Sequence, residues 1–93
     1  MKLEVITPES NVFAGEAISV SLPGVDGIFQ ILNNHAPIIS TLKQGEMKVE
    51  LSETPVQGSL SSEVVLEGQK TLKISIKGGV AELINNKLIV LAE

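Results

Sequence analysis

The stretch TLKISIK, residues 71–77, decides the fold class of this chain. Its apolar side chains occupy every second position, and polar side chains fill the positions between them. A period of two places alternate side chains on opposite faces of an extended backbone. The stretch therefore predicts a β-strand with one buried face and one solvated face.

The same alternation recurs nearer the N-terminus. Residues 17–22 place Ile18, Val20 and Leu22 together on one face, and residues 46–51 alternate in the same way. Each of these stretches predicts another strand, with the apolar set on the buried face.

Three shorter segments complete the predicted set of strands. Residues 3–6 and 29–31 read as short strands. Residues 88–91, LIVL, are continuously apolar, which predicts a strand that is covered on both faces. Asn85 and Asn86 precede that run and predict a two-residue hairpin turn, because Asn tolerates positive φ.

No long helix is predicted. The best helical candidate is residues 34–42, and Pro37 limits it to a single turn. Residues 52–69, rich in Ser, Glu and Gly, predict a mobile loop in which residues 64–66 extend the neighbouring hairpin. Short strands at regular spacing predict an all-β sandwich or barrel, folded as one domain over residues 1–93.

Composition narrows the classes of partner. The chain has a net charge of −4, which argues against nucleic acid and against an electrostatic hold on anionic lipid. It has no cysteine, which excludes disulfides and thiolate metal sites. No apolar run approaches the roughly 20 residues of a membrane span, and no signal peptide is visible. We expect a cytoplasmic protein that does not insert into lipid.

The polar residues predict no catalytic, metal or cofactor site. His35 is the only histidine and lies in a predicted turn, either bonded to nearby backbone or in contact with a partner. Glu9, Glu16 and Asp26 are candidates for paired acid–base carboxylates, but each is better explained as a solvated turn residue. The glycine-containing turns lack the spacing of a phosphate cradle. A binding or structural module is therefore favoured over an enzyme.

Several segments in a fixed order resemble the N-terminal domain of the ATP synthase epsilon subunit, which is called delta in mitochondria. They are residues 3–9 (LEVITPE), 12–16 (VFAGE), 22–37 (LPGVDGIFQILNNHAP), 76–82 (IKGGVAE) and 90–93 (VLAE). The resemblance implies a flattened antiparallel β-sandwich of about 8–10 short strands, in keeping with the strand spacing. It also implies a non-catalytic rotor subunit that couples ion-driven rotation to ATP synthesis.

The resemblance further implies two partners. Thr7, His35 and Ser40 match positions that face the gamma subunit. The subunit would sit at the foot of the central stalk, peripheral to the cytoplasmic face of a bacterial inner or plasma membrane. We expect the isolated chain to be a monomer. An unrelated sandwich scaffold or binding module is the alternative, and a glycan-active enzyme is a third possibility.

A second set of positions, Asp26, Gly27 and Ile28, matches the turn that faces the polar loops of the c-ring. Ile28 stands where the family often has an acidic residue. Gln30 stands where glycine is usual, and Asn33 where proline is frequent. The sequence stops before the C-terminal helical hairpin of the family, so we expect neither inhibition by an extended arm nor specific ATP binding.

Overall fold

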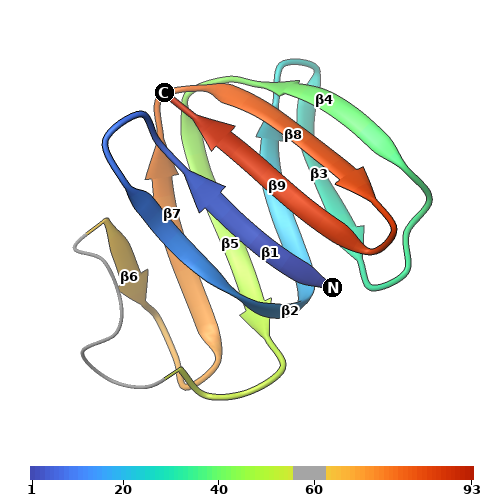
Figure 1. The fold of residues 1–93 in the computed structure, drawn as a ribbon. Helices are drawn as coiled ribbons and strands as arrows, with labels where there is room; N and C mark the ends of the chain where they lie inside the picture. The colour runs from blue at the N-terminus through green and yellow to red at the C-terminus, as the bar shows by residue number, and fades with distance from the viewer. Residues whose placement is uncertain (56–62) are drawn as a thin grey trace.

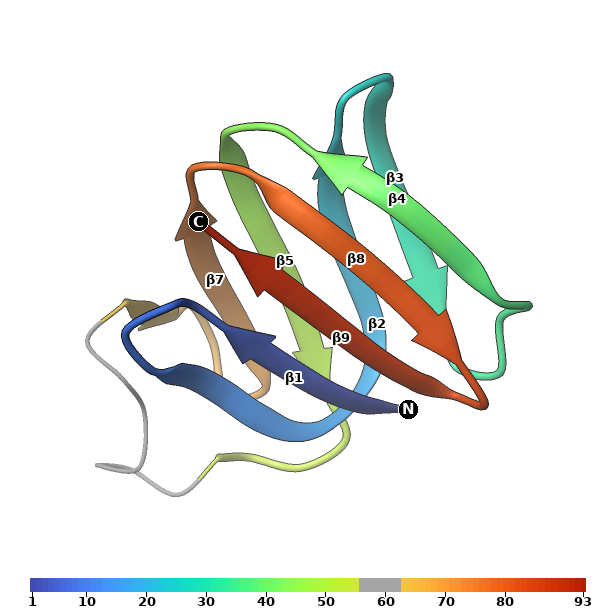
Figure 2. The same ribbon diagram turned by 45° about the horizontal axis from the view of Figure 1, so that its top comes forward.

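The structure, a computed structural model, describes residues 1–55 and 63–93. These residues form nine strands, shown in Figures 1 and 2. The strands are β1 (Lys2–Ile6), β2 (Asn11–Gly24), β3 (Gly27–Leu32), β4 (Ile38–Leu42), β5 (Gly45–Leu51), β6 (Val64–Leu66), β7 (Thr71–Ile76), β8 (Gly79–Ile84) and β9 (Lys87–Ala92). The described residues contain no helix that could span a membrane.

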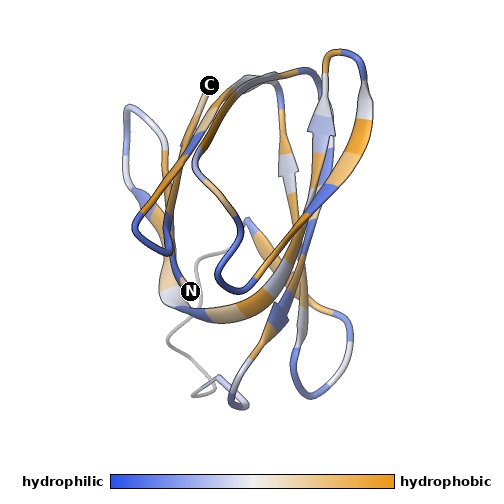
Figure 3. Ribbon diagram, turned by 90° about the vertical axis from the view of Figure 1, so that its right-hand side faces the viewer, coloured by the Kyte–Doolittle hydropathy of each residue, from blue (hydrophilic) through white to orange (hydrophobic). Residues whose placement is uncertain are grey.

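The strands form two layers, which face each other in the side view of Figure 3. One layer has the order β1-β9-β8-β4, and the other has β3-β2-β5-β7-β6. Strand β2 joins the layers, because its first half pairs with β1 and its second half pairs with β3 and β5. The prediction of an all-β sandwich is confirmed.

A β-bulge in β2 corrects one detail of the predicted pattern. The pairing of β2 with β5 shifts between Ala17 and Ser19, so Ile18 is an extra residue without a partner across the strands. Ile18 is consequently exposed, whereas Val20 and Leu22 are buried as predicted. The prediction that Ile18 is buried is therefore wrong, because a bulge interrupts the alternation of faces.

Among the strands that the structure describes, the pairing is antiparallel except at one place. Strands β1 and β9 run parallel, with Leu3 opposite Leu88 and Val5 opposite Val90. Strand β1 thus lies between an antiparallel neighbour, β2, and a parallel neighbour, β9. The prediction of an entirely antiparallel sandwich misses this pair, which joins the two ends of the chain.

Two turns show why particular residues occupy them. Asn85 and Asn86 adopt φ values of 51° and 59° between β8 and β9, which confirms the predicted hairpin turn. Gly79 adopts a φ of 148°, and a Cβ atom there would collide with the carbonyl oxygen of Leu91. Glycine is therefore required where β8 begins beside β9.

The core lies between the layers and is built from aliphatic side chains, as the composition predicts. Phe13 is buried, and Phe29 packs against the core while partly exposed. The largest fully buried side chains are Leu3, Leu22, Ile31, Met47, Leu72, Ile74, Leu83, Leu88, Val5, Val20, Val49 and Val90. In Figure 3 apolar and polar positions alternate along the strands that enclose them.

The outcome of the predictions differs between two connecting segments. Residues 64–66 pair with β7, which confirms that they extend the hairpin. The predicted mobile loop at residues 52–69 includes residues 56–62, which lie outside the described part of the chain. The helical candidate at residues 34–42 is wrong, because a turn is followed there by β4.

Candidate functional site

Four large aliphatic side chains lie exposed on the outer side of the β1-β9-β8-β4 layer. Ile39 is 71% exposed, Leu91 55%, Ile84 49% and Val80 41%. Val80 and Leu91 are direct partners across β8 and β9, and Ile39 lies opposite Glu82 on β8. We call these four residues the apolar face. The partly buried Ile89 belongs to the same side of β9 as Leu91.

The apolar face corrects the prediction for residues 88–91. Leu88 and Val90 point into the core, but Leu91 points outward and is more than half exposed. The strand is central in its layer, with backbone partners on both edges, yet the residues that the structure describes cover only one of its faces. A continuously apolar strand whose second face is open is typical of a surface that another molecule covers.

Charged residues border this face. Lys87 Nζ lies 3.4 Å from Glu4 Oε1, and both side chains are partly exposed. Glu82 is exposed between Ile39 and Ile89 on the neighbouring strands. An apolar patch with charged groups at its border resembles the apolar core and polar rim of a protein–protein interface, whereas Glu82 within the patch departs from that pattern.

Thr7 and Ser40, predicted from the resemblance, lie in this layer but not among the exposed apolar side chains. Thr7 follows β1, where its amide donates to Ser10 O at 2.9 Å and its Oγ1 accepts from Ser10 N at 3.2 Å. Ser40 lies in the middle of β4, half-buried, on the same side of the strand as the buried Leu42. Thr7 therefore lies at one end of the layer and Ser40 along its edge strand.

His35 lies in the exposed connection between β3 and β4. Its amide donates to Leu32 O at 3.1 Å, and its ring Nδ1 lies 2.7 Å from Ala36 O. Because a carbonyl oxygen only accepts, Nδ1 carries the proton of this hydrogen bond. The residue precedes the start of β4, whereas Thr7 follows the far end of β1. A single partner touching Thr7, His35 and Ser40 must therefore span the layer.

The second predicted set lies in the turn between β2 and β3. Asp26 and Gly27 are exposed, and Gly27 adopts a φ of 130°. Apart from Gly27 and its two chain neighbours, no described residue has an atom within 4 Å of where a Cβ would lie. Ile28 is 79% exposed. The turn is tied to β4 by the amide of Val25, which donates to Thr41 O at 3.1 Å.

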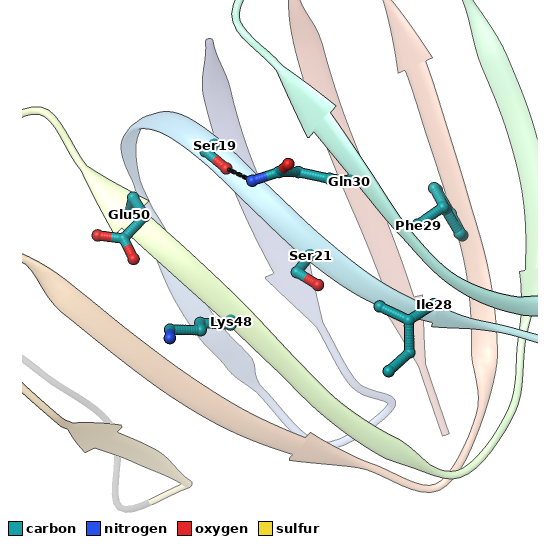
Figure 4. A pocket seen from close by; sticks show the side chains of 7 residues that line it. All are labelled: Ser19, Ser21, Ile28, Phe29, Gln30, Lys48 and Glu50. Atoms are coloured by element: carbon teal, nitrogen blue, oxygen red, sulfur yellow. Dashed lines mark hydrogen bonds between the residues drawn. The ribbon is translucent and has the colours of Figure 1, made fainter.

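Beside this turn lies a shallow hollow on the outer side of β2, β3 and β5, shown in Figure 4. Gln30 Nε2 donates to Ser19 Oγ at 2.7 Å across the two strands. Glu50 Oε2 accepts a hydrogen bond from Thr71 Oγ1 at 2.9 Å. Its lining residues are Ser19, Ser21, Ile28, Phe29, Gln30, Lys48 and Glu50. Because several of its polar groups bond to other side chains of the protein, the hollow does not indicate a ligand.

The structure brings no catalytic constellation together in the residues it describes. Glu9 and Asp26 flank opposite ends of the 14-residue strand β2, so they do not converge on one substrate. Glu16 instead lies beside the N-terminus, with Oε2 at 3.6 Å from the α-amino nitrogen of Met1. Within residues 1–55 and 63–93, no three His, Asp or Glu side chains gather as metal ligands.

In one exposed ion pair, each residue shifts the pKa of the other. Lys73 Nζ lies 2.6 Å from Glu67 Oε2. The hydrogen bond from Lys73 lowers the pKa of the Glu67 carboxyl, and the same bond raises the pKa of Lys73. Lys73 lies on β7, in the layer opposite the apolar face, and both side chains of the pair are partly exposed.

Comparison with known proteins places this geometry in a family. The sequence model of a protein family, the β-sandwich domain of the ATP synthase delta/epsilon chain, matches residues 1–93. The chain belongs to the ATP synthase delta/epsilon family. The ATP synthase epsilon chain of Chlorobium limicola is 36% identical over 99% of this chain and 88% of its own length. That of Chlorobaculum tepidum is 35% identical over 98% and 86%.

Solved structures support the same fold. A chain in the central stalk and c-ring structure of the Tetrahymena thermophila mitochondrial ATP synthase superposes with a TM-score of 0.72 at 16% identity. A chain of the Euglena gracilis mitochondrial ATP synthase superposes with a TM-score of 0.71, also at 16% identity. The two superpositions cover 99% and 97% of this chain, and they cover 62% and 48% of the Tetrahymena and Euglena chains.

Proposed function

We propose that this chain is a central-stalk subunit of the epsilon type in an F-type ATP synthase. It binds the gamma subunit and the ring, and it couples ion-driven rotation to ATP synthesis. Membership of the delta/epsilon family and the names of the bacterial relatives support this assignment. The subunit is peripheral, held at the cytoplasmic face of a bacterial inner or plasma membrane by its protein partners.

The apolar face is the observation that carries gamma binding. Its residues come from three neighbouring strands of one layer, so they form one surface rather than scattered apolar positions. Exposure of this apolar surface to water is unfavourable, and its burial against a partner would stabilise the complex. Thr7 follows β1 at one end of the layer, and His35 precedes β4 at the other end, as expected for the rim of an extended contact.

The turn between β2 and β3 is proposed to contact the ring. It projects at one end of the sandwich in Figure 2, and it ends in the exposed side chain of Ile28. The turn belongs mainly to the layer opposite the apolar face. This separation lets the subunit hold gamma with one surface while another part contacts the ring.

The subunit is proposed to be non-catalytic. Its role requires a stiff body with two contact surfaces, and a sandwich with an aliphatic core and backbone-paired strands supplies that stiffness. Torque then passes between gamma and the ring through contacts rather than through chemistry at this chain.

Co-expression with the gamma subunit of the same organism tests the assignment. We expect the two chains to co-purify as a stoichiometric complex in physiological salt. The chain has no native cysteine, so a cysteine at Ile28 provides a single attachment point for a cross-linker in the assembled synthase. Cross-linking to a ring subunit is expected. Failure to bind gamma would overturn the proposed gamma contact, and a missing ring cross-link would overturn the proposed ring contact.

A further inference from the structure

The connection that carries His35, residues 33–37, passes from one layer of the sandwich to the other. Its backbone hydrogen bonds lead back to the layer it leaves. The amide of Asn33 donates to Ile18 O at 3.2 Å, and the amide of His35 donates to Leu32 O at 3.1 Å. These bonds fix the start of the connection on β2 and β3, but they do not fix it relative to the apolar face.

Side-chain amides make the link to the other layer. Asn86 Nδ2 donates to Asn33 Oδ1 at 2.9 Å, and the amide of Asn34 donates to Asn86 Oδ1 at 2.7 Å. Asn33 Oδ1 also accepts from the α-amino group of Met1 at 2.6 Å. The backbone of Asn86 is itself held, because its carbonyl oxygen accepts from the amide of Lys2 at 3.0 Å.

We propose that Asn33 and Asn86 form a clasp that positions the His35 connection against the turn between β8 and β9. The turn follows Ile84, a member of the apolar face, so the clasp sets His35 and that face in one fixed arrangement. Asn86 is thus a positioning residue for the proposed gamma contact. The clasp itself depends only on this chain, whereas its effect on binding rests on the proposed function.

The chemistry of the two residues suits this role. An amide side chain both donates and accepts, so Asn86 bonds the connection at two points with one planar group. Asn34 adopts a φ of 65°, an uncommon conformation for a residue other than glycine, and its amide bonds to Asn86 in that conformation. A proline in place of Asn33 would have no side-chain acceptor for Met1 or Asn86.

The test compares Asn86→Gly with Asn85→Gly. Both positions have positive φ, which glycine adopts readily, so both variants retain the turn and share the entropic cost of glycine. Within the described residues Asn85 makes no side-chain hydrogen bond, which makes it the matched control. The readouts are NMR-detected hydrogen exchange of the Asn34 amide, the thermal midpoint, and the Kd for gamma.

We expect Asn86→Gly to accelerate exchange of the Asn34 amide at least about fivefold over Asn85→Gly, because that amide loses its acceptor. The Kd for gamma should rise at least about threefold in Asn86→Gly, with similar thermal midpoints for the two variants. Equal exchange in both variants would overturn the clasp. Faster exchange with an unchanged Kd would overturn its positioning role. If the wild-type chain does not bind gamma, the proposed function fails, and the exchange result still decides the clasp.

Discussion

Replacing Ile39 and Leu91 together by Thr removes apolar area from the apolar face without touching the core. Both side chains are mainly exposed, at 71% and 55%. Thr is β-branched and suits an exposed strand position, so we expect the thermal midpoint of the isolated chain to change little. The two exposed portions amount to slightly more than one whole side chain.

Fully burying one such side chain is worth about 1.5–3 kcal/mol, and Thr retains part of that area. The double variant should therefore bind gamma about 1–2 kcal/mol more weakly, which is about five- to thirtyfold in Kd by titration calorimetry. Val65→Thr is the matched control, because Val65 is 59% exposed on β6 at the far edge of the other layer. If the double variant and the control bind gamma equally, the apolar face is not the gamma surface.

Three further outcomes are expected. His35→Ala should weaken gamma binding by on the order of 1–3 kcal/mol. The thermal midpoint should stay nearly unchanged, because the side chain is exposed and, within the described residues, bonds only to adjacent backbone. Unfolding of the variant would show that His35 has a structural role instead. Gly27→Ala should lower the free energy of unfolding by about 1–2 kcal/mol, because alanine is strained at its positive φ. Gly79→Ala should lower it further, because the added Cβ also collides with the backbone of β9. Equal chemical denaturation midpoints for the two variants would contradict this. Lys73→Ala should raise the pKa of the Glu67 carboxyl in an NMR titration, because the hydrogen bond that lowers this pKa is removed. Since the pKa is lowered in the folded state, the pair stabilises the protein above the unfolded pKa, and this stabilisation is lost as pH falls through the folded pKa. An unchanged pKa in the variant would show that the pair does not persist in solution.

Local alternation predicted the strands whose two faces meet different surroundings. Residues 46–51 and 71–76 are such strands, because core lies on one side and water on the other. The error at Ile18 arose because a bulge depends on the pairing with β5, which local sequence does not express. Strand β4 was missed because Ile38 and Ile39 are consecutive apolar residues after a proline, so no alternation marks its start.

The apolar face was not predicted from the sequence, for a related reason. A run such as residues 88–91 has the same composition whether its second face is covered by its own chain or by a partner. Only the register of β8 against β9 brings Val80 beside Leu91 and reveals that both are exposed. His35 and the β2–β3 turn were predicted from family resemblance, and their role in binding stays a prediction.

The most direct test of gamma docking through the apolar face is site-specific cross-linking in the assembled synthase. The chain has no native cysteine, so Leu91→Cys and Ser75→Cys each carry one photoreactive maleimide, on opposite layers of the sandwich. Both positions are exposed in the isolated chain. We predict that Leu91→Cys cross-links to gamma in high yield and that Ser75→Cys does not. A gamma cross-link from Ser75→Cys with none from Leu91→Cys would contradict the proposed orientation of the subunit in the stalk.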